Sequence, residues 1–114
     1  MSGEVVSDGT VFGSAEWYDN RWAALTAEQR ELIVTFLRIE LKPSMLDKTR
    51  ELHAEDPEDW ASVYHFTTGM GVRNLLRRVL PDNELPLAPY PNGTAHSNWD
   101  DYYVQALEAA AGVR

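Results

Sequence analysis

The chain has 114 residues and a formal net charge of −8, from 18 acidic and 10 basic side chains. This length suits a single domain with its own core, and the excess of carboxylates disfavours binding to nucleic-acid backbones, which needs clustered Lys and Arg. Cysteine is absent, which excludes disulfides, thiolate metal sites and thiol catalysis and favours an intracellular, cytoplasmic protein.

The first 13 residues are rich in Gly, Ser and Asp and show little hydrophobic periodicity. We therefore expect residues 1–13 to form a flexible N-terminal arm and residues 14–114 to form a single helical domain. The arm has two acidic residues, no basic residue and no long apolar run, so the sequence predicts neither a signal peptide nor a membrane anchor. Trp17, Trp22 and Leu25 then predict a short helix that places its aromatic side chains on the core.

Thr26 and Gln29 form a capping box, in which each side chain can bond the backbone N–H of the other residue. A wide apolar stripe follows at helical spacing and ends at Pro43, which predicts a helix from residue 26 to the proline. A shorter helix is predicted over residues 44–54.

Asp56 and Pro57 predict another helix start, because aspartate can cap a helix and proline suits its first turn. Helical spacing of apolar residues then continues to residue 80, past Gly69 and Gly71. Each glycine costs about 1 kcal/mol in a helix relative to alanine. The sequence leaves open whether one helix runs through both glycines or whether the chain breaks near residues 67–68.

Residues 81–97 are predicted to be a long connector, because they hold four of the six prolines and the turn pair Asn92-Gly93. Ser97 can cap a last helix that buries Trp99 and Tyr103 and can end at Gly112. No convincing strand or repeat is found. The sequence thus predicts an all-α fold, a compact single-domain bundle of four to five helices.

The stretch from His65 to Asn74, with the sequence HFTTGMGVRN, concentrates polar residues and glycines. On a helix His65, Gly69 and Arg73 share one face, and the glycine leaves a groove that a neighbouring helix or a ligand could fill. Together with the acidic pair 100–101, the stretch resembles the HFxxGxxxRN core of a small helical domain family of unknown function.

This resemblance covers about residues 60–80 and implies a small helical domain but no activity. The chain has Met70-Gly71-Val72 before the arginine, where the family pattern has bulkier residues.

Two interpretations of this stretch stay open. In the structural one, Arg73 is buried and pairs with Asp100 or Asp101, while His65 and Asn74 bond nearby backbone or hydroxyl groups. In the functional one, His65 acts as an acid or base, Arg73 binds a carboxylate or phosphate, and Asp100 orients the histidine. No nucleophile has a recognisable setting, so we expect no catalysis; His65, Arg73 and Asp100 would be the catalytic candidates of an enzyme.

Signals for metals and cofactors are weak. His53, His65 and His96 are 12 and 31 residues apart, which matches no compact ligand motif. The Gly69-x-Gly71 pair follows no strand and precedes no Lys-Ser/Thr, so it is not a phosphate-binding loop. We predict no metal and no cofactor.

The aromatic content favours a protein-binding surface. Four Trp and five Tyr exceed the usual needs of a small helical core, and exposed aromatics are typical of interfaces. Tyr102 and Tyr103 are neighbours on a helix and point in different directions, so one of them is expected at the surface. The predicted binding residues are Arg73, Asn74, Trp99, Asp100, Asp101, Tyr102 and Tyr103.

Three functions remain open. The first is a small acidic interaction module, of an accessory or phage-encoded type, that binds an unidentified protein partner and neither nucleic acid nor membrane. The second is a small-molecule-binding or catalytic pocket built from His65, Arg73 and an acidic residue. The third is an inhibitor that mimics nucleic acid, which requires carboxylates spaced like phosphates on one face.

Overall fold

The computed structural model describes residues 3–64 and 67–114, and most of them are helical. The α-helices among these residues are α1 (Ala15–Ala24), α2 (Ala27–Glu40), α3 (Pro43–Glu55), α4 (Thr68–Val79) and α5 (Tyr103–Ala111). The short elements are the 3-10 helices η1 (Trp60–Val63), η2 (Asp82–Glu84) and η3 (Trp99–Asp101) and the strands β1 (Ala88–Pro89) and β2 (Ala95–His96). The predicted helical bundle is confirmed, and the antiparallel pair β1–β2 corrects its description as all-α.

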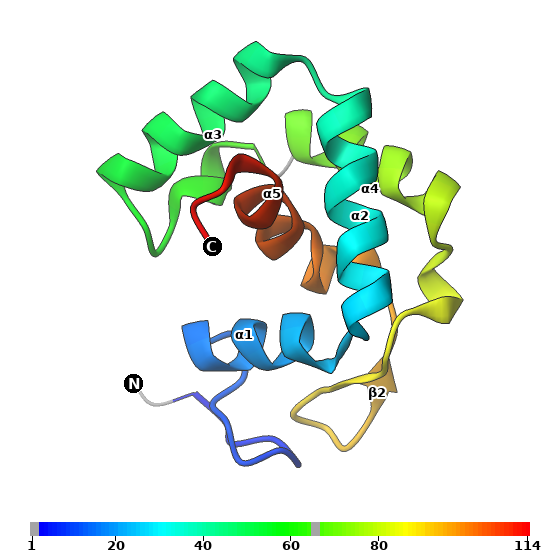
Figure 1. The fold of residues 1–114 in the computed structure, drawn as a ribbon. Helices are drawn as coiled ribbons and strands as arrows, with labels where there is room; N and C mark the ends of the chain where they lie inside the picture. Colours follow the sequence, from blue (N-terminus) through cyan, green and yellow to red (C-terminus); the bar gives the residue numbers. More distant parts are fainter. Residues whose placement is uncertain (1–2, 65–66) are drawn as a thin grey trace.

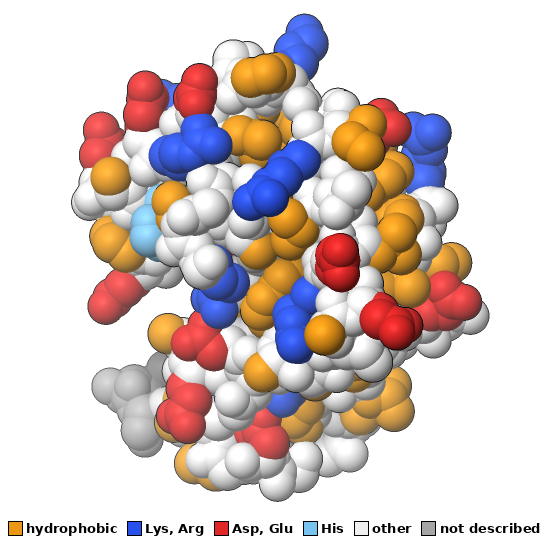
Figure 2. Space-filling view, viewed as in Figure 1, with side chains coloured by type: hydrophobic (Ala, Val, Ile, Leu, Met, Phe, Trp, Pro, Cys, Tyr) orange, Lys and Arg blue, Asp and Glu red, His pale blue; other side chains and the backbone are white. Residues whose placement is uncertain are grey.

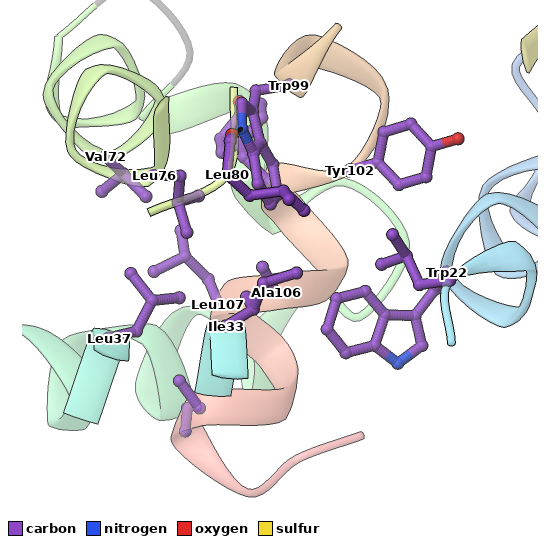
Figure 3. Close-up of a cluster of buried hydrophobic side chains, with 14 of the residues drawn as sticks. Trp22, Ile33, Leu37, Val72, Leu76, Leu80, Trp99, Tyr102, Ala106 and Leu107 are labelled. Carbon is purple, nitrogen blue, oxygen red and sulfur yellow. Dashed lines mark hydrogen bonds between the residues drawn. The ribbon is translucent and has the colours of Figure 1, made fainter. Parts of the chain in front are cut away.

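Helix α5 lies at the centre of the molecule, and α1, α2, α3 and α4 all contact it (Figure 1). Figure 3 shows Ala106 and Leu107 of α5 among Ile33 and Leu37 of α2 and Leu76 of α4. The alanines of α5 let the surrounding helices approach closely, and burial of this apolar surface is the main force that holds the bundle together.

The predicted capping box of α2 is confirmed. The Gln29 N–H donates to the Thr26 hydroxyl at 3.0 Å, and the Thr26 N–H donates to the Gln29 side chain at 2.9 Å. Both bonds satisfy backbone donors that a helix start leaves without partners, so the start of α2 is fixed locally.

The end of α5 is fixed by a glycine and two arginines. Gly112 ends the helix with a left-handed φ of +77°, as predicted. Arg38 of α2 donates to the Ala110 carbonyl at 3.0 Å, and Arg50 of α3 donates to the Ala111 carbonyl at 2.7 Å. The last carbonyls of α5 therefore tie three helices together.

The segment after Asp56 and α4 are separate helical elements, and α4 begins at Thr68 and runs through both glycines. This decides between the two possibilities that the sequence left open, one continuous helix or an interruption near residues 67–68. Asp56 accepts a bond from the Asp59 N–H at 3.2 Å, as a cap does, but a turn and η1 follow instead of an α-helix. The first turn of α4 then packs so closely on the preceding segment that the Gly69 N–H donates to the Tyr64 carbonyl at 2.6 Å.

Residues 3–13 form a packed hairpin, so the prediction of a flexible arm is wrong for this range. Val5 and Val11 pair as an antiparallel bridge, and Gly9 turns the chain with a φ of +86°. Val6 is buried with Trp17 of α1 and Ala88 of β1 in a second, smaller hydrophobic cluster. One buried valine beside a turn forms no periodic pattern, so the hairpin could not be predicted from hydrophobic spacing.

A buried arginine of α1 fastens this hairpin. The Arg21 Nη2 donates to Asp8 Oδ2 at 2.7 Å, and the guanidinium carbon lies 5.0 Å from the centre of the Trp17 ring. Thr10 donates its hydroxyl to the other oxygen of Asp8 at 2.5 Å. The charge of Arg21 is thereby paired and also packed on an aromatic face.

The connector over residues 81–97 is held against the core by the side chains of two residues that come after it in the sequence. Trp99 donates its indole N–H to the Leu80 carbonyl at 2.8 Å, and Tyr102 donates its hydroxyl to the Pro86 carbonyl at 2.6 Å. The predicted turn at Gly93 is confirmed, with a φ of +81°. Within the described parts of the chain, no helix combines the length and apolar character needed to cross a membrane.

Candidate functional site

Arg73 lies in α4 with 7% of its surface exposed. Its Nε is 2.9 Å from Asp100 Oδ1, and its guanidinium carbon is 4.8 Å from the centre of the Tyr103 ring. The Asp100 side chain is 56% exposed, so the ion pair lies at the edge of the core. The structure thus brings Arg73 to Asp100, in the arrangement that the structural interpretation predicted.

The groove expected at Gly69 is filled by the protein itself. A Cβ added at this position would lie 2.7 Å from the Tyr64 carbonyl oxygen and 3.2 Å from the Tyr103 ring. Gly69 therefore permits the close approach of α4 to α5 and leaves no room for a ligand.

Asn74 and Asp101 lie near Arg73 in the sequence pattern but bond other residues in the structure. Asn74 is exposed, and its Oδ1 accepts a bond from Arg77 at 2.7 Å. Asp101 is buried and accepts a bond from the Tyr90 hydroxyl at 2.8 Å, and burial raises the pKa of this carboxyl. His65 lies outside the described residues, so its role as an acid or base stays a prediction.

The aromatic residues of the predicted binding surface belong to the core. Trp99 and Tyr102 are 0% exposed and Tyr103 is 2% exposed, so the prediction that one of the two tyrosines lies at the surface is wrong. Helix α5 is covered on nearly every side, and neighbouring positions that point in different directions both meet protein. Burial raises the pKa of Tyr102 to about 12.

A cleft with a volume of about 840 Å³ lies between the first half of α1, the segment 57–62 and one side of α5. Figure 2 shows the surface hollowed at the left of the molecule, between α1 and the segment that follows α3. Asp100 and Tyr103 of the predicted binding residues lie on its wall. No motif in the sequence predicts this cleft.

Five carboxylates from four segments of the chain line the cleft. Asp19 comes from α1, Glu58 and Asp59 from the turn before η1, Asp100 from η3 and Glu108 from α5. The aromatic side chains of the lining are Tyr18, Trp60 and Tyr103. Among the described residues that line the cleft, Arg114 carries the positive charge. Carboxylates beside aromatic faces form an environment that attracts cations, through charge and through the ring quadrupole.

Glu108 is the buried carboxylate of the cleft, with 6% of its surface exposed. Its Oε2 accepts a bond from the Trp60 indole N–H at 2.9 Å, and its Oε1 accepts one from Arg114 Nε at 2.9 Å. Arg114 Nη2 also donates to Asp19 Oδ1 at 2.6 Å. A buried charge is tolerated only when it is paired, so these contacts explain how Glu108 stays within α5.

Gln105 lies on the same wall, one turn before Glu108. It is 6% exposed, and its Oε1 is buried without a hydrogen-bond partner in the part of the chain that the structure describes. Buried amide oxygens are normally bonded. The amide oxygen of Gln105 is therefore a buried acceptor at this wall that the described residues leave without a donor.

Most residues that define this cleft carry no recognisable pattern in the sequence. Glu108 alone carried a signal, as an isolated acid within the apolar run 106–111, where a carboxylate needs a partner. Its partners Trp60 and Arg114 come from different segments, and no local pattern connects them.

Comparison with protein-family models, with curated proteins and with solved structures found no match to this chain. The resemblance to the HFxxGxxxRN family therefore stays a prediction. In residues 3–64 and 67–114, no three His, Asp or Glu side chains are grouped so that they could hold a metal ion.

Proposed function

We propose that this protein is a non-catalytic interaction module that binds a basic segment of a protein partner in the cleft beside α5. The observation that carries the proposal is the convergence of five carboxylates from four segments of the chain on one hollow with aromatic walls. Asp100 is already paired with Arg73, and Arg114 pairs with both Asp19 and Glu108. A basic peptide would therefore bring its cations first to Glu58 and Asp59, and its aliphatic stems could pack on the aromatic rings.

The alternatives receive less support from the geometry. The catalytic alternative relies on Arg73, which is paired with Asp100 and packed on Tyr103. Mimicry of nucleic acid relies on carboxylates spread along one face, whereas five of the 18 acidic residues line a concave surface. Direct binding to nucleic acid is disfavoured by the net charge of −8.

Fluorescence anisotropy with a labelled peptide of alternating basic residues and glycine tests the proposal. Glu58 and Asp59 are exposed, and no ion pair of the described residues involves them, so Glu58→Gln/Asp59→Asn should leave the fold intact. We expect this double variant to weaken binding about threefold or more, since each exposed charge contributes about 0.2–1 kcal/mol.

The matched control is Glu31→Gln/Glu40→Gln, which removes the same charge from exposed positions of α2. It should leave the affinity for the peptide nearly unchanged. Equal losses in the two double variants would show that only the overall charge attracts the peptide, and no binding at low salt would reject the proposal outright.

A further inference from the structure

We infer that the cleft recognises the guanidinium group of arginine, and that the chain's own Arg114 occupies part of this site as a displaceable competitor. The inference rests on the proposed function and specifies the ligand of the same cleft. The contacts of Arg114 show which cation the carboxylates of the cleft already bind.

Arg114 bridges two walls of the cleft. Its Nε donates to Glu108 of α5 at 2.9 Å and its Nη2 donates to Asp19 of α1 at 2.6 Å. A guanidinium presents several N–H donors in a fixed plane, whereas the ammonium of lysine is a compact point charge. Two carboxylates that approach from different elements therefore suit arginine better than lysine.

Glu108 is held in place independently of Arg114. Its second oxygen accepts the Trp60 indole N–H at 2.9 Å, and the side chain is only 8% exposed. The carboxylate is thus oriented before any cation arrives, which lowers the entropy lost when a guanidinium binds. His53 Nε2 also lies 3.8 Å from the Glu108 Oε2. Because a buried carboxylate is costly when it loses a paired cation, Arg114 leaves most readily in exchange for another positive group.

The side chain of Arg114 is the group in this site that a partner's arginine could displace. It follows Gly112, beyond the end of α5, and its side chain is 27% exposed. Its partner Asp19 has a 54% exposed side chain, where water and salt weaken an ion pair. The contact with Asp19 therefore restrains Arg114 weakly, and the bond to the buried Glu108 carboxylate is the one that a partner's cation has to replace.

Gln105 gives a partner's arginine an advantage over the resident one. The bonds of Arg114 go to Glu108 and Asp19, and the Gln105 amide oxygen stays unsatisfied. A guanidinium that reached it would satisfy the buried acceptor, whose desolvation is otherwise uncompensated.

Titration calorimetry with N-acetyl-L-arginine amide tests the inference on the wild type and on Arg114→Ala. We expect Arg114→Ala to bind this probe about fivefold or more tightly than the wild type, because a competitor that fills a site most of the time reduces the apparent affinity accordingly. The probe should also raise the Tm of Arg114→Ala. N-acetyl-L-lysine amide should bind more weakly to the variant.

Two further variants separate this effect from overall charge and from misfolding. Arg78→Ala removes an exposed arginine of α4, and we expect no gain in affinity. Asp19→Asn alters the exposed wall of the site without touching the core, and within Arg114→Ala it should reverse most of the gain. Equal affinity of wild type and Arg114→Ala for the arginine probe would overturn Arg114 as a competitor. Equal binding of the lysine probe would overturn guanidinium recognition.

The two proposals fail differently. If the basic peptide binds the wild type through Glu58 and Asp59 but Arg114→Ala gains nothing, only the role of Arg114 is rejected. If the peptide binds neither protein, the proposed function is rejected, and the inference built on it falls with it.

Discussion

At the scale of single residues, Arg73 shows how a helical core accepts a positive charge. Its guanidinium lies between the carboxylate of Asp100 and the face of Tyr103, at 2.9 Å and 4.8 Å respectively. The aliphatic part of the side chain packs within the core, so removal of Arg73 affects packing as well as charge. This arrangement makes Arg73 a structural residue of α4.

We expect Arg73→Ala to lower the free energy of unfolding by about 2–3 kcal/mol, below the value for a fully buried pair because Asp100 stays hydrated. For a chain of this size the fall in Tm is about 10 °C, and circular dichroism melts at neutral pH measure it. Arg78→Ala, at an exposed position of the same helix, should change stability by less than about 0.5 kcal/mol. A fall of about 2 °C or less for Arg73→Ala would contradict the structural role.

Residue-scale predictions from the sequence succeeded where a physical requirement left few choices. A buried arginine needs an acid, and Asp100 was one of two candidates named for Arg73. The exposure of Tyr102 or Tyr103 was wrong, because periodicity shows which positions share a face but not how many faces of a helix are covered. Gln105 and Arg114 gave no signal, since their importance depends on the cleft and not on their neighbours in sequence.

At the scale of elements, the contact between α4 and α5 depends on one of two glycines. Gly69 faces the Tyr64 carbonyl and the Tyr103 ring, whereas a Cβ added at Gly71 would meet nothing within 4 Å. The two positions lie in the same helix, two residues apart, and differ mainly in what surrounds them. They form a matched pair for a measurement of close packing.

We expect Gly69→Ala to lower the free energy of unfolding by about 1–3 kcal/mol, because the new methyl group forces α4 away from the Tyr64 carbonyl. Gly71→Ala should raise it by about 0.5–1 kcal/mol, because alanine loses less backbone entropy in a helix. Urea unfolding of both variants measures these changes. Stabilisation by both substitutions would show that α4 does not need the close approach.

Element-scale prediction was accurate where local chemistry fixed a boundary. The capping box at Thr26 and the glycine at residue 112 were both recovered in the structure. The strands β1 and β2 have two residues each, which is too short for an alternating pattern to emerge. The segment after Asp56 has the signals of a helix start, but tertiary packing of Trp60 and Tyr64 selected a 3-10 helix.

At the scale of the whole molecule, the smaller hydrophobic cluster joins the N-terminal hairpin to the connector. The pair of Asp8 and Arg21 fixes the hairpin beside this cluster. The pKa of Asp8 is lowered, chiefly by the hydrogen bond from Thr10 and also by Arg21. This links the stability of the whole protein to pH through one carboxylate.

We expect Asp8→Ala to lower the free energy of unfolding by about 1–2 kcal/mol at neutral pH, because Arg21 stays buried without its carboxylate. A lowered pKa stabilises the fold above the ordinary value of 3.8, and this contribution is lost as pH falls through the lower pKa of the folded state. The difference between Asp8→Ala and wild type should therefore shrink in acid, as chemical unfolding across this pH range would measure. The control is Asp47→Ala, which removes the carboxylate of an exposed pair with Arg50 and should change the free energy of unfolding little at any pH. If the stability difference between Asp8→Ala and wild type were the same at every pH, the linkage to Asp8 would be contradicted.

Helix α5 presents different residues to the core and to the cleft, and this sets a limit on insertions and deletions in the chain. An α-helix turns by about 100° per residue, so one residue added between η3 and α5 would rotate every later side chain by that angle. Gln105 and Glu108 would then leave the cleft wall, and Leu107 would leave the core. The loop between β1 and β2 can change in length without this rotation. The segment from Trp99 to Tyr103 has to keep its number of residues, because otherwise the core face and the cleft face of α5 are both displaced.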